Sequence, residues 1–195
     1  MKLQYSNNAI FFKDAFPDIM REYALTFLDV HDPITAEIMD NTEVSGGKTN
    51  LELRQTEVRF IHCKESTEPL FNWITDFANE YRWYFSGKTG MTPNLTNKVM
   101  RRLSPEPIQI ATYKEMYYYQ WHQDGPAEDG ARRITLMTPL TSSKDYEGGE
   151  LQFKDEDIPT WALDIGSIIL HRPELWHRVI PVTQGVRNSL VTWFE

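Results

Sequence analysis

Three side chains in two separate segments have the types and spacing of a metal site. His122 and Asp124 belong to the run Gln120-Trp-His-Gln-Asp124. On an extended strand they point to the same face, because side chains there alternate with a period of two. His177 follows Asp124 by 53 residues, in a second strand-like segment that a rolled-up sheet can bring to face the first. Two neutral imidazoles and one carboxylate leave three adjacent positions on a metal open, which is typical of non-haem Fe(II) oxygenases.

A His-x-Asp sequence by itself is weak evidence for a metal. Asp124 can instead fix the tautomer of His122, and His177 can be a buried ring that hydrogen-bonds to the protein. His171 stands six residues before His177 and can also approach the site. Whether these residues form a metal site or are ordinary buried histidines therefore depends on the other sequence features around them.

Arg187 follows His177 by ten residues and begins another strand-like run. If residues 187–194 form a strand, Arg187 shares one face with Ser189, Val191 and Trp193. A guanidinium at the inner end of an apolar barrel is costly to bury alone, and its planar fork suits a carboxylate. No acidic residue is an obvious partner, so the carboxylate of a ligand is one candidate. A surface position paired with one of the 28 acidic residues is the alternative.

The elements that must position these residues differ between the two halves of the chain. Asp14 can cap a helix with Pro17 in its first turn, because apolar residues recur at helical spacing up to Leu28. Ser66 can cap a second helix that ends near Trp83. Residues 57–62 alternate like a strand, and the stretch from 86 to 107 is typical of a long functional connection.

From residue 108 onward the pattern changes to short strands separated by turn residues. The predicted strands cover residues 108–113, 116–124, 132–140, 149–154, 166–171, 175–182 and 187–194. Strands at this spacing favour a sandwich, a jelly roll or a barrel. We therefore expect one mainly β domain over residues 1–195 with flanking helices (α+β), in which residues 1–85 form a helical support region and residues 108–195 form the core.

Composition narrows the partners and the compartment. The chain has 195 residues and a formal net charge of -8, which disfavours binding of nucleic acid through bulk charge. A single cysteine, Cys63, excludes an internal disulfide framework, so a reducing cytoplasm is the expected location. The sequence has no run of 18 apolar residues, so it predicts no membrane-spanning helix. The oligomeric state stays open.

Further landmarks occur in a fixed order around the candidate ligands. They are Tyr113, Tyr119, His122-x-Asp124, Glu147-Gly-Gly-Glu-Leu151, Gly166-Ser-Ile-Ile-Leu170, the run from His177 to Arg187, and Trp193. In this order and spacing the chain resembles the 2-oxoglutarate- and Fe(II)-dependent dioxygenases. It is most similar to their prolyl-4-hydroxylase-like branch, including small bacterial and bacteriophage members. The resemblance is in register over residues 108–195 and looser before them.

The resemblance implies a double-stranded β-helix, which is a jelly-roll barrel of the cupin kind, with the N-terminal helices packed outside. It assigns His122, Asp124 and His177 as ligands of Fe(II), and Arg187 as the partner of the C5 carboxylate of 2-oxoglutarate. Its remaining assignments are pocket residues that hold or line the co-substrate: Tyr113, Tyr119, Val179 and Trp193. O2 would be the second co-substrate, and ascorbate is a candidate reductant. The location would be a bacterial cytoplasm, or that of a host if the chain is phage-encoded.

The implied activity is oxidative decarboxylation of 2-oxoglutarate coupled to hydroxylation of a C–H bond, with a peptidyl proline as the first candidate substrate. The same chemistry on a free amino acid, a small metabolite or a nucleobase is an alternative. A non-catalytic jelly-roll module that binds a carboxylate ligand is a third. Residues 86–107 and the loop from Gly125 to Arg132 would grip a substrate. On strand 132–140, Met137 and Thr138 are both candidates to contact the co-substrate.

Overall fold

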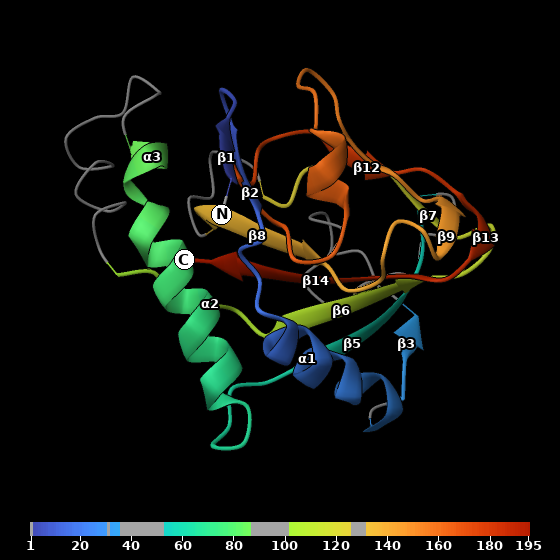
Figure 1. The fold of residues 1–195 in the computed structure, drawn as a ribbon, viewed down its shortest axis with the longest axis horizontal. Helices are drawn as coiled ribbons and strands as arrows, with labels where there is room; N and C mark the ends of the chain where they lie inside the picture. Colours follow the sequence, from blue (N-terminus) through green and yellow to red (C-terminus); the bar gives the residue numbers. More distant parts are fainter. Residues whose placement is uncertain (1, 31, 36–52, 87–101, 126–131) are drawn as a thin grey trace, which may run out of the picture.

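The structure, a computed structural model, describes residues 2–30, 32–35, 53–86, 102–125 and 132–195. Two β-sheets share one apolar core, and helices cover the other side of the larger sheet (Figure 1). The helices are α1 (Asp18–Val30), α2 (Glu68–Tyr81) and α3 (Trp83–Ser86). The predicted jelly-roll-like β core with flanking helices is confirmed. Among the described residues, no helix is both long enough and apolar enough to cross a membrane.

The larger sheet has eight strands. Their spatial order is β1 (Lys2–Tyr5), β2 (Ala9–Lys13), β11 (Ile168–His171), β8 (Ile134–Pro139), β14 (Arg187–Phe194), β6 (Ile108–Tyr113), β5 (Glu57–Ile61) and β3 (Ile34–Thr35). The smaller sheet runs β10 (Leu151–Phe153), β12 (His177–Val179), β7 (Tyr118–His122) and β4 (Arg54–Gln55). Strands β9 (Tyr146–Gly148) and β13 (Val182–Gly185) form a separate pair, and η1 (Thr160–Leu163) is a short 3-10 helix.

The larger sheet is buried on both faces. Alternate side chains of its strands belong to two apolar cores, one between the sheet and the helices and one between the two sheets. In β2, Ile10 and Phe12 pack against the helices, whereas Ala9 and Phe11 belong to the core between the sheets. The same alternation of period two orients β14, so that Leu190 and Phe194 face the helices while Val191 faces the other way. The pocket described below lies on the side of the second core.

The N-terminal hairpin of β1 and β2 was not among the predicted elements, whereas the predicted strand over residues 57–62 is present as β5. The helical support region predicted over residues 1–85 therefore also contains this hairpin. Strand β2 is a short run of apolar residues buried on both faces, and such a run has no alternation to separate a strand from a helix. Helix α1 begins at Asp18, not after a cap at Asp14. Asp14 has a positive φ of 55°, and the N–H groups of Ala15 and Phe16 donate to the Gly166 carbonyl.

Several other boundaries also differ from the predicted ones. Helix α2 follows Thr67, not Ser66, and the Thr67 hydroxyl donates to the His62 carbonyl. Strand β7 begins at Tyr118 because Met116, with a φ of 67°, makes a turn before it. The predicted strand 175–182 divides into β12 and the start of β13.

Gly148, at the end of β9, and Gly149, directly after it, both adopt left-handed backbone conformations, with φ values of 69° and 67°. A Cβ atom on Gly149 would lie 2.7 Å from Val182 Cγ2 and 3.2 Å from Arg187 Cδ. We expect Gly149→Ala to lower the free energy of unfolding by about 2–3 kcal/mol, because backbone strain and the clash add up. Chemical denaturation measures this, with Gly166→Ala as the control. That glycine also has a positive φ, but a Cβ atom there would meet nothing closer than 4.0 Å. Equal losses in both variants would contradict the role of the close contact.

Candidate metal centre and its pocket

The two histidines of the candidate centre are paired residues on neighbouring strands. In the smaller sheet β12 lies antiparallel to β7, and His177 is directly opposite His122. The strands are therefore neighbours in one sheet and do not face each other across two sheets. Asp124 follows the end of β7, where its N–H donates to the Pro173 carbonyl at 2.8 Å. One ligand atom from each of His122, Asp124 and His177 lies within 4.8 Å of the other two.

The backbone fixes the tautomer of both rings. Nδ1 of His122 lies 2.8 Å from the Gln120 carbonyl, and Nδ1 of His177 lies 2.8 Å from the Leu175 carbonyl. A carbonyl only accepts, so in each neutral ring Nδ1 carries the proton and Nε2 keeps its lone pair. The two Nε2 atoms lie 3.8 Å and 3.7 Å from the Asp124 carboxylate. Both lone pairs are thus available beside one carboxylate, which is the donor set that a divalent metal needs.

Asp124 is a buried carboxylate whose charge is maintained by its neighbours. Its side chain is 7% exposed, and the Thr135 hydroxyl donates to Oδ2 at 2.7 Å. Burial alone would raise the pKa of this carboxyl. The positive charge that the neighbouring histidines carry when protonated, together with the Thr135 hydroxyl, nevertheless holds its pKa well below the ordinary value. The third of these rings is His171, fully buried, with Nε2 at 3.8 Å from Asp124 Oδ2. The sequence left its approach to the site open, and the structure brings it there.

The pKa values of two buried rings predict a pH dependence for the metal-free protein. Burial, and next the proximity of His177, lowers the pKa of His122 to about 3 and that of His171 to about 4. Unfolded histidines bind protons below pH 6.5, whereas these folded rings do not, so stability falls as the pH drops from about 7 toward 4. At pH 5 each of the two rings should lower the free energy of unfolding by about 2 kcal/mol relative to neutral pH. Urea unfolding with chelator present at pH 7.5 and pH 5 measures this, and repeating it at high salt controls for surface charge. Equal unfolding free energies at the two pH values would contradict it.

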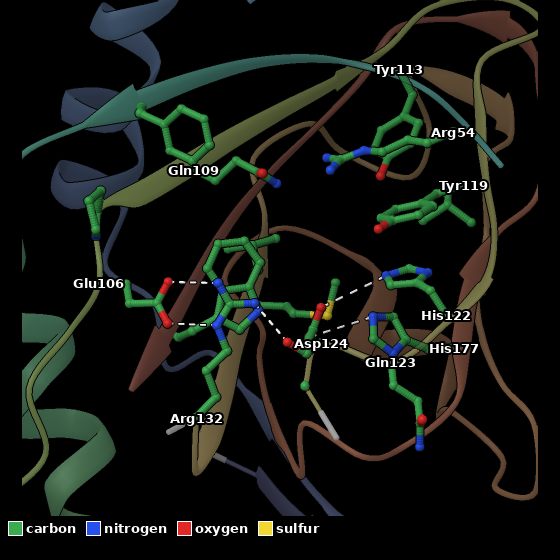
Figure 2. A pocket seen from close by; sticks show the side chains of 17 residues that line it. Arg54, Glu106, Gln109, Tyr113, Tyr119, His122, Gln123, Asp124, Arg132 and His177 are labelled. Atoms are coloured by element: carbon green, nitrogen blue, oxygen red, sulfur yellow. Dashed lines mark hydrogen bonds and ion pairs between the residues drawn. The ribbon is translucent and has the colours of Figure 1, made fainter. Parts of the chain in front are cut away.

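A cavity of about 520 Å³ opens beside the three candidate ligands (Figure 2). The cavity is lined by all three and by four of the five residues expected to hold or line a co-substrate: Tyr113, Tyr119, Val179 and Trp193. From β8 the lining residue is Met137, whereas Thr138 is fully buried on the opposite face of the strand. The uncertainty between Met137 and Thr138 is resolved in favour of Met137 as the side chain that reaches the cavity.

Arg187 is buried, at 5% exposure, but is not among the residues that line this cavity. Its guanidinium lies over the Tyr113 ring, with Cζ at 5.3 Å from the centroid. Nη1 donates to the Ser189 hydroxyl at 3.3 Å. In the part of the chain that the structure describes, no carboxylate pairs with Arg187. The guanidinium therefore lies next to a cavity residue and keeps donors for a ligand.

Three aromatic and cationic groups stack on one wall of the cavity. The Tyr119 ring lies parallel to His122, with centroids 3.4 Å apart and planes at 11°. Arg54, from β4, stacks on the same tyrosine with Cζ at 4.4 Å. Burial raises the pKa of Tyr119 to about 12, so its hydroxyl stays a donor at neutral pH. Arg54 is 7% exposed and has no ion-pair partner among the described residues.

An ion pair lies on another wall of the cavity (Figure 2). Arg132 binds both carboxylate oxygens of Glu106, at 2.6 Å and 2.7 Å, and donates to the Asp124 carbonyl at 2.7 Å. The guanidinium also lies over Trp193. The two loops expected to grip a substrate, residues 86–107 and Gly125–Arg132, fall mostly outside the described residues. Their described ends supply Glu106, Pro107, Gly125 and Arg132 to the cavity.

Sequence reasoning assigned no individual role in this site to several of its residues: Arg54, Glu106, Gln109, Arg132, Thr135 and Ser189. Arg54 and Glu106 carry no local motif. Arg54 reaches the site through the pairing of β4 with β7, and Glu106 through its N–H bond to the Trp193 carbonyl and its ion pair with Arg132. Ser189 and Thr135 had a usable signal. Ser189 shares the face of Arg187 on β14, and Thr135 lies on β8 in the strand that follows the His-x-Asp loop.

Comparison with known proteins agrees with this geometry. Residues 108–195 match the model of the 2OG-Fe(II) oxygenase superfamily. A PKHD-type hydroxylase of Idiomarina loihiensis is 33% identical over 103 residues, which cover 52% of this chain and 47% of the relative. The chain thus spans about half the length of this curated relative.

Solved structures share the fold at low sequence identity. A prolyl-4-hydroxylase of Pseudomonas putida superposes with a TM-score of 0.65 and 17% identity, covering 96% of this chain and 92% of its own. A prolyl hydroxylase of Trichoplax adhaerens, solved in complex with a peptide fragment of hypoxia inducible factor, gives a TM-score of 0.67 and 14% identity, covering 97% and 84%. The resemblance drawn from the sequence is confirmed.

Proposed function

We propose that the chain is an Fe(II)- and 2-oxoglutarate-dependent hydroxylase, because residues 108–195 match the model of the 2OG-Fe(II) oxygenase superfamily. The observation that supports the proposal most strongly is the arrangement of three donor atoms at the cavity. Two Nε2 lone pairs and one carboxylate lie within 4.8 Å of one another, and backbone carbonyls hold both rings in the metal-binding tautomer. Such a donor set fits Fe(II) and leaves positions open for co-substrates.

We assign roles to the residues on this basis. His122, Asp124 and His177 would hold Fe(II). Arg187 would bind the C5 carboxylate of 2-oxoglutarate with its free donors, while the Ser189 hydroxyl orients the guanidinium. Tyr113 would hydrogen-bond to the co-substrate, and its ring would carry the guanidinium. Tyr119, Val179 and Trp193 would line the pocket and exclude water from the reacting carbon.

Fe(II) with 2-oxoglutarate and O2 supplies the oxidant that hydroxylates a C–H bond, with succinate and CO2 as products. The contribution of this chain is positional. Stacking between Tyr119 and His122 limits rotation of the ring. The Thr135 hydroxyl holds one oxygen of Asp124, and Arg132 holds the backbone of the same residue. Ascorbate as a reductant and a cytoplasmic location stay predictions from the sequence.

A peptidyl proline is the first candidate substrate. The support is that both structural neighbours named above are prolyl hydroxylases and that one was solved with a peptide. The cavity at the candidate centre has an open polar wall formed by Glu106, Gln109 and Arg132, which can hydrogen-bond to a peptide backbone. The partner would then be a peptide or protein.

A small acidic molecule is a second candidate, and Arg54 is the observation that favours it. This buried guanidinium faces the cavity without a carboxylate partner among the described residues, so it can bind an anionic group of a free amino acid or metabolite. A non-catalytic binding module would need no complete ligand set, and here all three ligand residues and Arg187 are present.

Succinate release and mass spectrometry test the proposal together. The protein is incubated with Fe(II), O2 and 2-oxoglutarate, alone and with a library of proline-containing peptides or with free amino acids. We expect succinate above the level of an Asp124→Ala variant and one added oxygen on a substrate. Absence of succinate, together with absence of any stabilisation of the metal-loaded protein by 2-oxoglutarate, would leave the binding module as the function.

A further inference from the structure

His171 is a buried histidine with a nitrogen that has no hydrogen-bond partner. The side chain is fully buried, and its Nδ1 lies 2.8 Å from the Arg172 carbonyl. That carbonyl can only accept, so in the neutral ring Nδ1 carries the proton and Nε2 presents a lone pair. Among the described residues, no donor meets this Nε2. Buried polar atoms without a partner are rare in native proteins and call for a physical explanation.

The lone pair faces another acceptor. Nε2 of His171 lies 3.8 Å from Asp124 Oδ2, the same oxygen that accepts the Thr135 hydrogen bond. Two acceptors at this distance in a buried region repel each other, because the low dielectric strengthens the electrostatic interaction. The ring has little freedom to turn away, since it packs edge-on against Phe153 and His177 at centroid distances of 5.3 Å and 4.9 Å. The metal-free arrangement is therefore electrostatically unfavourable at this contact, as it is at the 3.8 Å and 3.7 Å contacts of the two candidate ligand rings with Asp124.

A divalent cation bound to Asp124 would add an attraction to offset this repulsion. The Nε2 lone pair is the negative end of the dipole of a neutral imidazole and lies 3.8 Å from an oxygen of this carboxylate, so a positive charge held there would be stabilised by the ring. His171 is not in the group of ligand atoms that lie within 4.8 Å of one another, so it would act from outside the ligand set. Groups behind the ligands commonly change metal affinity by about 10- to 100-fold.

We propose that His171 is a positioning residue of the metal centre that favours the metal-bound state in two ways. Its Nε2 lone pair stabilises a bound divalent cation, and it destabilises the metal-free centre by facing Asp124. This inference rests on the proposed function, because it takes His122, Asp124 and His177 as the ligands. It assigns no titration and no direct bond to His171.

Replacement of the ring by an apolar side chain gives two effects of opposite sign. We expect His171→Phe, which removes the lone pair and fills the space of the ring, to raise the melting temperature of the chelator-treated protein by about 2–4 °C. The same variant should bind Mn(II), the probe used here, about tenfold more weakly than the wild type, as measured from the EPR signal of free Mn(II). His171→Leu removes the same nitrogen with a smaller side chain and should shift the Mn(II) affinity in the same direction.

Phe153→Leu is the matched control, because Phe153 packs against both His171 and His177 but carries no polar atom. Loss of packing should lower the melting temperature of the metal-free control variant, which is the opposite of the effect expected for His171→Phe. If the wild type binds Mn(II) and both His171 variants bind it equally well, or if the metal-free His171→Phe protein is no more stable, the role of His171 is overturned and the proposed function stands. If the wild type itself does not bind Mn(II), both proposals fall.

Discussion

Replacing Asp124 with alanine should abolish turnover and weaken Mn(II) or Fe(II) binding by more than about 100-fold. Asp124 supplies the only negative charge among the three candidate ligands, and it lies between the two Nε2 atoms at 3.8 Å and 3.7 Å. Its loss leaves two neutral imidazoles, which hold a divalent ion far less tightly. The expected effect exceeds the range of about 10- to 100-fold that is common for groups behind the ligands, because the ligand itself is removed.

Metal affinity by calorimetry and succinate release measure the effect of Asp124→Ala. Asp155→Ala is a suitable control, because it removes an exposed acidic residue that follows Lys154, outside the cavity. Circular dichroism separates loss of the ligand from loss of the fold. Full activity in the Asp124 variant would remove this residue from the ligand set.

Replacing Arg187 with alanine should raise the 2-oxoglutarate concentration needed for half-maximal turnover by about 30-fold or more, with little change in metal affinity. The guanidinium is buried and keeps donors that no described carboxylate uses. Removing one partner of a buried charge pair commonly costs about 2–5 kcal/mol, and 2 kcal/mol corresponds to about 30-fold. Arg187→Lys keeps the positive charge but loses the planar fork of the guanidinium. Its 2-oxoglutarate requirement should therefore lie between that of the wild type and that of Arg187→Ala.

Arg178→Ala provides the matched control for Arg187. Arg178 is the neighbour of His177 on β12, but it bonds to Gln152 and stacks on Trp121, away from the cavity. Its loss should leave the 2-oxoglutarate requirement within about twofold, because this half-buried side chain does not line the cavity. If metal binding in Arg187→Ala collapses as far as 2-oxoglutarate binding does, Arg187 has a structural role and the assignment is wrong.

Two long strands of the larger sheet, β6 and β14, were the most predictable elements from the sequence. The bounds of β6 and β14 match the predicted strands 108–113 and 187–194, because β-branched and apolar residues run between clear turn signals. The approach of His177 to His122 was expected from a rolled-up sheet, although their direct pairing on neighbouring strands was not. Strand pairing depends on contacts across 55 positions of sequence, for which a local pattern holds no information.

The parts that the sequence did not predict share one physical cause. The β1–β2 hairpin, Arg54 and Glu106 each reach their places through contacts with distant segments. The apolar run of β2 has no alternation because both faces are buried, one against the helices and one in the core between the sheets. His171 had a signal in its distance from His177, but only the fold shows that its unpaired nitrogen lies beside Asp124.

The central claim is that His122, Asp124 and His177 hold one divalent ion beside the cavity. Anomalous diffraction from crystals grown with Mn(II) and 2-oxoglutarate tests it most directly. The account predicts a single strong peak within about 2.3 Å of Nε2 of both histidines and of one Asp124 oxygen. A peak bound by other residues, or no peak in crystals that contain the metal at saturating concentration, would contradict it.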